Sequence, residues 1–298
     1  MKYHTLLLFL VLGATLVCAE GQNAPINNTI SGQSQTINAT DSGFRPDLNG
    51  FSFENYGSDI PTVGLTPEDM QRMFGDKVIA SNAGGKIILT PPANRWMIEA
   101  NNAMANGHCE GMAVLSELIY YNKVNPLVLG GKDAADLSLD NQNVQSEIAY
   151  WWATQVTSPG GSKKVDESPN AVLETLINAF KGGSKATEWW VLGIFMPDGT
   201  EGHTITPIAV KDFGNDTAEI LVYDNNFPDV IKSVMIDTKN NTWMYYASVN
   251  PNEPSAQYTG NASTYNLEVV SISSRLGKQR CDFCDNSLGG IEAQPGGG

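Results

Sequence analysis

The sequence predicts an α+β fold in which a helical lobe is followed by an antiparallel β-sheet lobe. Apolar residues recur at helical spacing in the first part of the chain, whereas short β-rich runs separated by turn residues follow residue 188. Helices grouped before strands are typical of α+β domains, because an alternating order would indicate a parallel sheet. The chain has 298 residues, of which 41% are hydrophobic and 17% charged, so it can bury a large core.

The N-terminus has the pattern of a secretory signal peptide. A basic residue precedes an apolar run over residues 6–17 that is too short to span a bilayer, and small residues follow at cleavage-site spacing. We expect residues 1–19 to be removed after Ala19 and the protein to be secreted. Lipidation of Cys18 is the alternative, which the bulk of Val17 disfavours.

Residues 20–49 contain hardly any large apolar side chain, so we expect them to form a disordered polar lead-in. The domain is expected over residues 50–275, and residues 276–298, which carry a CxxC motif, as a flexible tail. Export would allow N-glycosylation. The chain contains acceptor sequons at Asn27, Asn38, Asn215, Asn240 and Asn261.

The expected helices have recognisable starts. Thr66 and Ser168 are each followed by a proline, which combines an N-cap side chain with the residue favoured at the first helical position. Apolar residues three and four apart predict a helix through residues 112–119, and a further helix is expected over 148–156. The strands are expected over residues 189–195, 203–210, 218–223, 230–236, 242–247 and 267–273.

The net charge indicates which classes of binding partner are unfavourable. Eighteen basic and 32 acidic residues give a formal net charge of −14. This argues against nucleic acid or an anionic membrane surface as the main partner. After the signal peptide, no stretch is apolar enough to anchor the chain in a membrane.

Histidine is scarce, and this limits the possible chemistry. The chain has three histidines, and His4 would leave with the signal peptide, so only His108 and His203 remain. A thiol becomes a useful nucleophile where an imidazole takes its proton and a helix N-terminus favours the thiolate. Cys109 lies at an expected helix start, and the small Gly111 would let that helix pack closely against the second lobe. His203 is the candidate base, because adjacent residues such as His108 and Cys109 rarely face each other.

A hairpin brings an acid to His203. The strand that His203 begins is followed by turn residues 213–216, and the chain returns to Asp224. Antiparallel pairing around this turn places Asp224 beside or diagonal to His203, where a carboxylate would orient the imidazole. Asn225 is the alternative orienting residue, but strand alternation directs it to the opposite face.

These segments resemble the papain-like cysteine peptidase superfamily. The resemblance lies in residues 107–113 (GHCEGMA), 202–204 (GHT) and 223–226 (YDNN), and it extends roughly over residues 96–246. It implies a papain-like α+β fold, with the cysteine on a helical lobe and the histidine and acid on a sheet lobe. It also implies a cysteine hydrolase that cleaves peptide or isopeptide amides of a peptide or protein substrate through a thioester acyl-enzyme, with no cofactor.

Cys109, His203 and Asp224 would form the catalytic triad of such an enzyme. Two other functions stay open. One is a non-catalytic extracellular binding module on the same fold, and the other is transglutaminase-like acyl transfer, although transglutaminase-like domains usually place the histidine closer to the cysteine.

The sequence departs from the papain-like pattern at two positions. The oxyanion-hole glutamine expected some six residues before the cysteine is replaced by Ala103, and Asn102 is our candidate donor, with Asn101 and Asn106 as alternatives. Glu110 follows the nucleophile. Since an inward carboxylate would oppose thiolate formation, we expect Glu110 to point to solvent.

The CxxC motif is the remaining cysteine feature. In an oxidising compartment, Cys281 and Cys284 are expected to form a local disulfide. No metal site is expected, because the histidines and the spare cysteine are already assigned and a tetrahedral zinc set cannot be completed.

Overall fold

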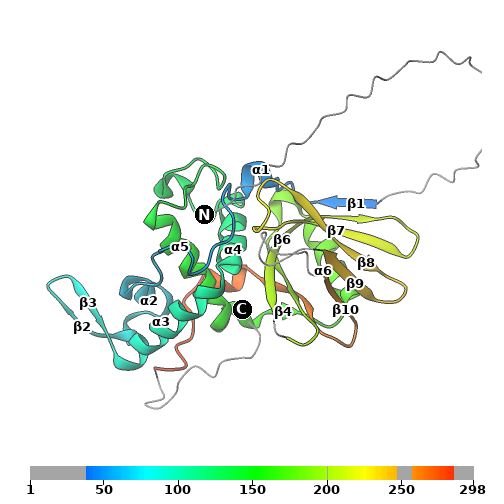
Figure 1. The fold of residues 1–298 in the computed structure, drawn as a ribbon. Coiled ribbons are helices and arrows are strands. Elements are labelled where there is room, and N and C mark those ends of the chain that lie inside the picture. Colours follow the sequence, from blue (N-terminus) through cyan, green and yellow to red (C-terminus); the bar gives the residue numbers. More distant parts are fainter. Residues whose placement is uncertain (1–37, 200, 247–256, 285–298) are drawn as a thin grey trace, which may run out of the picture. The chain divides into compact units, whose positions relative to one another are not determined.

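The computed structural model describes residues 38–199, 201–246 and 257–284. The expected signal peptide (1–19), the first part of the lead-in (20–37) and the last part of the tail (285–298) lie outside the described residues. The fold is α+β: helices occupy most of the first half, and an antiparallel sheet follows (Figure 1). No helix in the described part of the chain has the length and hydropathy needed to cross a bilayer.

Helices α2 and α6 begin at the capping residues that the sequence predicts, whereas α5 begins at Gln142, before the expected start at residue 148. Thr66 and Asp69 form a capping box at the start of α2, and the side chains of Thr90 and Ser168 accept hydrogen bonds from the first turns of α3 and α6. The helices are α1 (Pro46–Asn49), α2 (Pro67–Phe74), α3 (Pro91–Ala103), α4 (Cys109–Tyr120), α5 (Gln142–Ala153) and α6 (Pro169–Phe180).

The main sheet is antiparallel, with strand order β10-β9-β8-β7-β6-β5-β11-β4, and β1 pairs with β6 beside this path. A separate hairpin joins β2 (Ile79–Ala83) to β3 (Lys86–Leu89). The strands of the main sheet are β1 (Asn38–Asp41), β4 (Lys164–Val165), β5 (Trp190–Phe195), β6 (Gly202–Asp212), β7 (Thr217–Tyr223), β8 (Ile231–Asp237), β9 (Thr242–Tyr246), β10 (Gln257–Asn261) and β11 (Leu267–Ser271).

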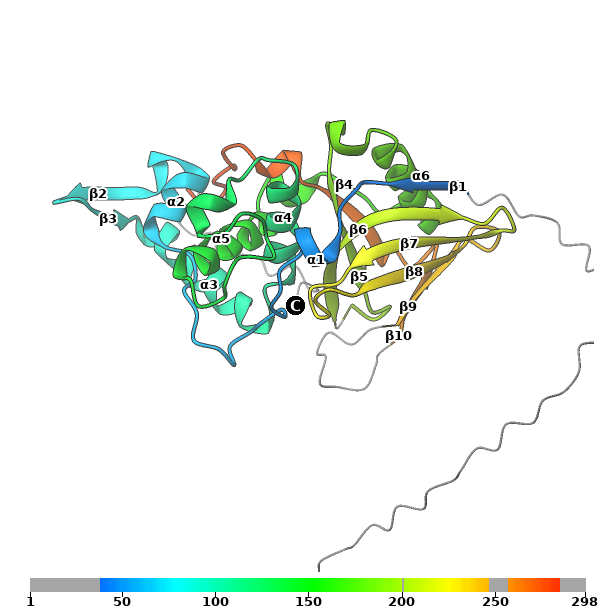
Figure 2. The same cartoon turned by 90° about the horizontal axis from the view of Figure 1, so that it is seen from above.

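Two large hydrophobic cores, and a smaller cluster that contains Phe44 and Tyr223, hold the described elements together. The first lies among helices α2, α3, α4 and α5 and contains Trp96, Leu115 and Trp152. The second lies between the sheet and α6, which contributes Leu173 and Leu176. Helix α4 contacts both the helix α5 and the strand β6, and both views show it between the helices and the sheet (Figures 1 and 2). The start of α4 is therefore placed next to the start of β6.

The ordered domain begins before residue 50, so the expectation of a disordered lead-in is wrong for residues 38–49. Strand β1 pairs with β6 from Asn38 to Asp41, and Phe44 is fully buried. Its ring contacts those of Tyr120 and Tyr223. One large aromatic side chain and a backbone ladder thus order a segment whose composition is otherwise polar.

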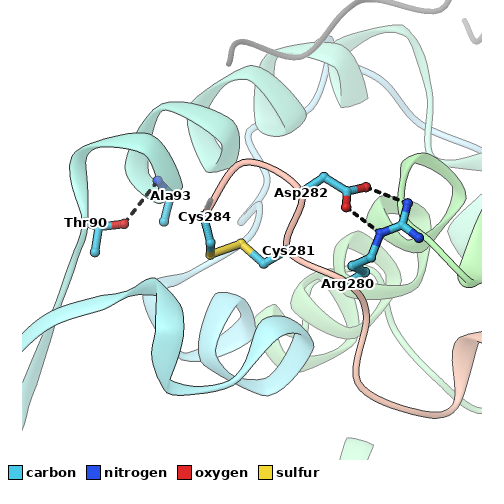
Figure 3. Close-up of a disulfide and its surroundings, with 6 residues drawn as sticks. All are labelled: Thr90, Ala93, Arg280, Cys281, Asp282 and Cys284. Atoms are coloured by element: carbon cyan, nitrogen blue, oxygen red, sulfur yellow. Dashed lines mark hydrogen bonds and ion pairs between the residues drawn. A yellow bond between two sulfur atoms is a disulfide. The ribbon is translucent and has the colours of Figure 1, made fainter. Parts of the chain in front are cut away.

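The expectation of a flexible tail is likewise wrong for residues 276–284. The backbone N–H of Gln279 donates to the carbonyl of Met73, and the ring of Phe283 packs against those of Phe74 and Trp96. Cys281 and Cys284 form a disulfide beside the start of α3, where Thr90 caps Ala93 (Figure 3). The neighbouring Arg280 and Asp282 form an exposed ion pair, also drawn in Figure 3.

Candidate active site

Cys109 is the first residue of α4 and directly follows its N-cap residue, His108. The first-turn N–H groups of a helix have no partner within the helix, and they favour a negative charge at its N-terminus. Gly107 turns the chain into the helix with φ of 144°, a conformation that side chains disfavour. Cys109 is half-buried and is the free cysteine of the described residues.

His203 lies at the start of β6, and its side chain is almost fully buried. Its Nε2 atom lies 2.7 Å from Oδ1 of Asp224. The imidazole also shares a hydrogen bond with the thiol of Cys109. Because Nε2 is hydrogen-bonded to the carboxylate, Nδ1 is the ring nitrogen that faces the sulfur.

Asp224 directly follows β7 and has no exposed surface. The register of β6 with β7 brings the end of β7 to the start of β6, which is the hairpin arrangement that the sequence predicts. Besides His203, two donors hold the Asp224 carboxylate: the hydroxyl of Tyr245 at 2.5 Å from Oδ2 and the backbone N–H of Asn226 at 2.9 Å from Oδ1. The carboxylate is therefore fixed on both oxygens.

The surroundings of His203 and Asp224 favour the charged form of both side chains. Burial alone would lower the pKa of His203, but the Asp224 carboxylate and the Cys109 thiol outweigh burial and raise that pKa to about 10. Burial opposes ionisation of Asp224, yet His203, Tyr245 and the backbone donor keep the Asp224 pKa below its usual value. His203 is thus an imidazolium at neutral pH.

Asn225 does not replace Asp224 as the partner of the imidazole. Its side-chain Nδ2 donates to the backbone carbonyls of Cys109 (3.1 Å) and Thr204 (3.0 Å). This amide joins the first turn of α4 to β6, so Asn225 positions the helix rather than the base.

Glu110 points inward, and the expectation that it faces solvent is wrong. Its side chain is buried, with 5% of the residue exposed. One oxygen accepts a hydrogen bond from the hydroxyl of Thr204 (2.6 Å), and the other forms an ion pair with Arg275. A buried cation that follows β11 therefore makes the inward carboxylate tolerable.

His108 is buried at the start of α4. Its ring stacks on that of Tyr56 with a centroid distance of 4.1 Å, and Nδ1 lies 2.8 Å from the Tyr56 carbonyl. Burial lowers the pKa of His108. These contacts give His108 a structural role.

Asn102 is exposed on α3, whereas Asn55, which the sequence did not single out, contacts the residues before Cys109. Oδ1 of Asn55 accepts a hydrogen bond from the backbone N–H of His108 at 2.8 Å. Its Nδ2 lies 3.1 Å from the position that a Cβ of Gly107 would occupy. The Asn55 amide is therefore held next to Gly107 and His108, which directly precede Cys109.

Asn55, Tyr245 and Arg275 are the site residues that sequence reasoning missed. Asn55 precedes Cys109 by more than fifty positions in an irregular segment, and no periodic pattern relates the two. Tyr245 shows inward alternation with Trp243 in β9, which predicts burial but not the contact with Asp224. Arg275 is the single charged residue in the apolar and small-residue run 269–277 (VVSISSRLG), and this was a signal that could have drawn attention to it.

Comparisons of the chain with protein-family models, with curated proteins and with solved structures gave no significant match. Within residues 38–199, 201–246 and 257–284, no group of three or more His, Cys, Asp or Glu side chains is arranged to hold a metal ion.

Proposed function

We propose that the chain is a secreted cysteine hydrolase of papain-like type that cleaves peptide or isopeptide amide bonds. The observation that carries this proposal is the continuous hydrogen-bonded series from the Cys109 thiol through His203 to Asp224. A half-buried thiol at a helix N-terminus, an imidazole on its sulfur and a carboxylate on the far ring nitrogen are the parts of an activated nucleophile.

In the proposed reaction, the thiolate of Cys109 attacks the carbonyl carbon of the amide, so that a C–S bond forms and the carbonyl oxygen becomes an oxyanion. The imidazolium of His203 gives its Nδ1 proton to the leaving amine as the C–N bond breaks, which leaves a thioester on Cys109. His203 then takes a proton from water, the water oxygen attacks the thioester, and the acid leaves as the thiolate is restored.

Asp224 has a positioning role in this scheme. It keeps the imidazole in the tautomer that presents Nδ1 to the sulfur, and it stabilises the imidazolium between turnovers. The hydroxyl of Tyr245 supports Asp224 in turn, because burial and the carboxylate both raise the pKa of Tyr245 and keep its proton in place as a donor.

The test measures the alkylation of intact protein by iodoacetamide, with the Cys109 peptide quantified by mass spectrometry. His203→Ala should slow alkylation at pH 7 by about tenfold or more, since the thiolate loses its cationic partner. The exposed variant Asn102→Ala serves as a matched control and should label like the wild type. Equal labelling of wild type and His203→Ala would overturn the proposal.

A fluorogenic peptide library then identifies the activity. Turnover by the wild type that is lost in Cys109→Ser supports hydrolysis. Peptide binding without turnover supports the binding module, and incorporation of an added amine in place of water supports acyl transfer.

A further inference from the structure

A buried ion pair lies directly behind the proposed nucleophile. Arg275 ends a 3₁₀ turn (Ser273–Arg275) that follows β11, and it has no exposed surface. Its guanidinium forms the ion pair with Glu110 and also donates to the hydroxyl of Thr154 (3.1 Å) and the carbonyl of Ser271 (3.3 Å). The arginine is therefore held in place on several sides.

The ion pair is connected to both members of the proposed nucleophile–base pair. Glu110 is the neighbour of Cys109 in α4, and its second oxygen accepts from Thr204, which is the neighbour of His203 in β6. The Asn225 amide makes a second link between the same two backbones. The distance between sulfur and imidazole thus depends on contacts made one residue away from each.

A carboxylate at this place has an electrostatic cost. A negative group beside a thiolate disfavours the thiolate, and an uncompensated charge in a buried site is expensive. Arg275 supplies the opposite charge at the Glu110 carboxylate. Glu110 can consequently serve as an anchor for Thr204 without opposing ionisation of its neighbour.

We propose that Arg275 is a positioning residue for Cys109 that acts through Glu110: it neutralises the carboxylate that fastens the first turn of α4 to β6. This inference rests on the proposed hydrolase function. Other titratable groups lie near this pair, and they are unchanged in the variants below: His203 of β6 and Tyr258 of β10 interact with Cys109, and Glu268 of β11 interacts with Glu110.

The test compares four proteins by the rate of Cys109 alkylation as a function of pH and by kcat and KM on the peptide identified above: wild type, Arg275→Met, Glu110→Gln and the double variant. Arg275→Met leaves Glu110 unpaired, so we expect alkylation at pH 7 to slow by about tenfold or more and the profile to move to higher pH. The double variant should stay within about threefold of wild type in alkylation, because it carries neither charge. Glu110→Gln leaves Arg275 as an unpaired cation, which favours the thiolate, so this variant should not be slower than wild type.

Rescue by the double variant separates charge compensation from mere packing. If the double variant is as slow as Arg275→Met, or if Arg275→Met alkylates like wild type, the inference is wrong. A wild type whose alkylation is independent of His203 would instead overturn the proposed function itself, so the two failures are distinguishable.

Thr204→Val keeps the test valid if Arg275→Met does not fold, because it retains the ion pair and removes only the hydrogen bond to Glu110. We expect kcat to fall by about tenfold with KM and the pH profile of alkylation little changed. An unchanged kcat would show that the link between Glu110 and β6 does not position the nucleophile.

Discussion

The imidazole of His203 is engaged through both of its nitrogens, and this is the central feature at the scale of single residues. Nε2 faces a carboxylate that is itself held by Tyr245 and by the backbone after it, while Nδ1 faces the thiol. A ring held in this way cannot rotate, so its proton is directed to one atom. Such preorganisation is what separates an activated cysteine from an ordinary buried one.

The raised pKa of His203 predicts a pH-dependent stability. In the unfolded chain the imidazole titrates near 6.5, and in the folded protein near 10. Its stabilising contribution is therefore fully present below about pH 6.5 and is lost as the pH rises through about 10. We therefore compare the free energy of unfolding of wild type with that of His203→Gln. The advantage of wild type over His203→Gln should be larger at pH 6 than at pH 10, by roughly 2–4 kcal/mol. Urea titrations at both pH values measure this difference, and a constant difference would contradict the shift.

The oxyanion donor is a second prediction at this scale. Asn55 is fixed beside the residues that lead into Cys109, whereas Asn102 is exposed on α3. If the Asn55 amide supports the oxyanion, Asn55→Ala should lower kcat by roughly 10²–10³-fold, and Asn102→Ala should leave kcat unchanged. Steady-state kinetics with one peptide decides between the residues, and the reverse order of effects would favour Asn102.

What the sequence could predict at the residue scale follows from local rules. A helix start, a strand start and a hairpin register are enough to suggest that Cys109, His203 and Asp224 converge. The inward turn of Glu110 could not be predicted in the same way, because its partner Arg275 is brought in by β11, far along the chain. A carboxylate whose partner is not known is expected to face solvent, because its charge is costly to bury.

At the scale of elements, the crossing of α4 and α5 determines where the nucleophile lies. Gly111 is the close contact: a Cβ added there would lie 2.1 Å from the carbonyl oxygen of Ile148 in α5. The sequence suggested that this small residue allows packing against the second lobe, and the structure shows instead that it allows packing against a neighbouring helix. Capping residues predicted the starts of α2 and α6, whereas β1 was missed because a polar strand of four residues has no hydrophobic pattern.

Substitution of Gly111 should therefore be costly. Alanine favours helices, but here its methyl group would push against backbone that cannot rotate away, so we expect Gly111→Ala to lower the free energy of unfolding by about 1–3 kcal/mol. It should also slow alkylation of Cys109, two residues away. Gly277→Ala is the matched control, since no atom lies within 4 Å of the added Cβ, and it should change stability by less than about 0.5 kcal/mol. Equal denaturation midpoints would contradict the close-contact argument.

At the scale of the whole domain, the segment after β11 connects the sheet to the helices through hydrogen bonds and side-chain packing. It leaves the sheet, passes the start of α4 and reaches α2 and α3, as the orange-to-red ribbon shows (Figures 1 and 2). Lys278 donates to the carbonyls of Gln71 and Arg72 at the end of α2, and Gln279 bonds the carbonyl of Met73. Composition predicted a loose tail here because polar contacts to helix ends leave no apolar pattern in the sequence.

The disulfide closes the last turn of this segment. The disulfide closes a short loop and so restricts the unfolded chain. We therefore expect Cys281→Ser/Cys284→Ser to lower the free energy of unfolding by about 2 kcal/mol. The alkylation rate of Cys109 should stay at the wild-type value in the folded variant, because Phe283 still packs between α2 and α3. Chemical denaturation with and without reductant measures the effect, and a wild type insensitive to reductant would contradict it.

The placement of β11 has a consequence for the order of assembly. This strand is the last of the main sheet in the described sequence, yet it lies inside the sheet, between β5 and β4. Its partner β5 lies far back along the chain, and long-range pairings of this kind close late. Strand β4 can therefore join the sheet, and Arg275 can meet Glu110 behind Cys109, only once β11 has paired with β5.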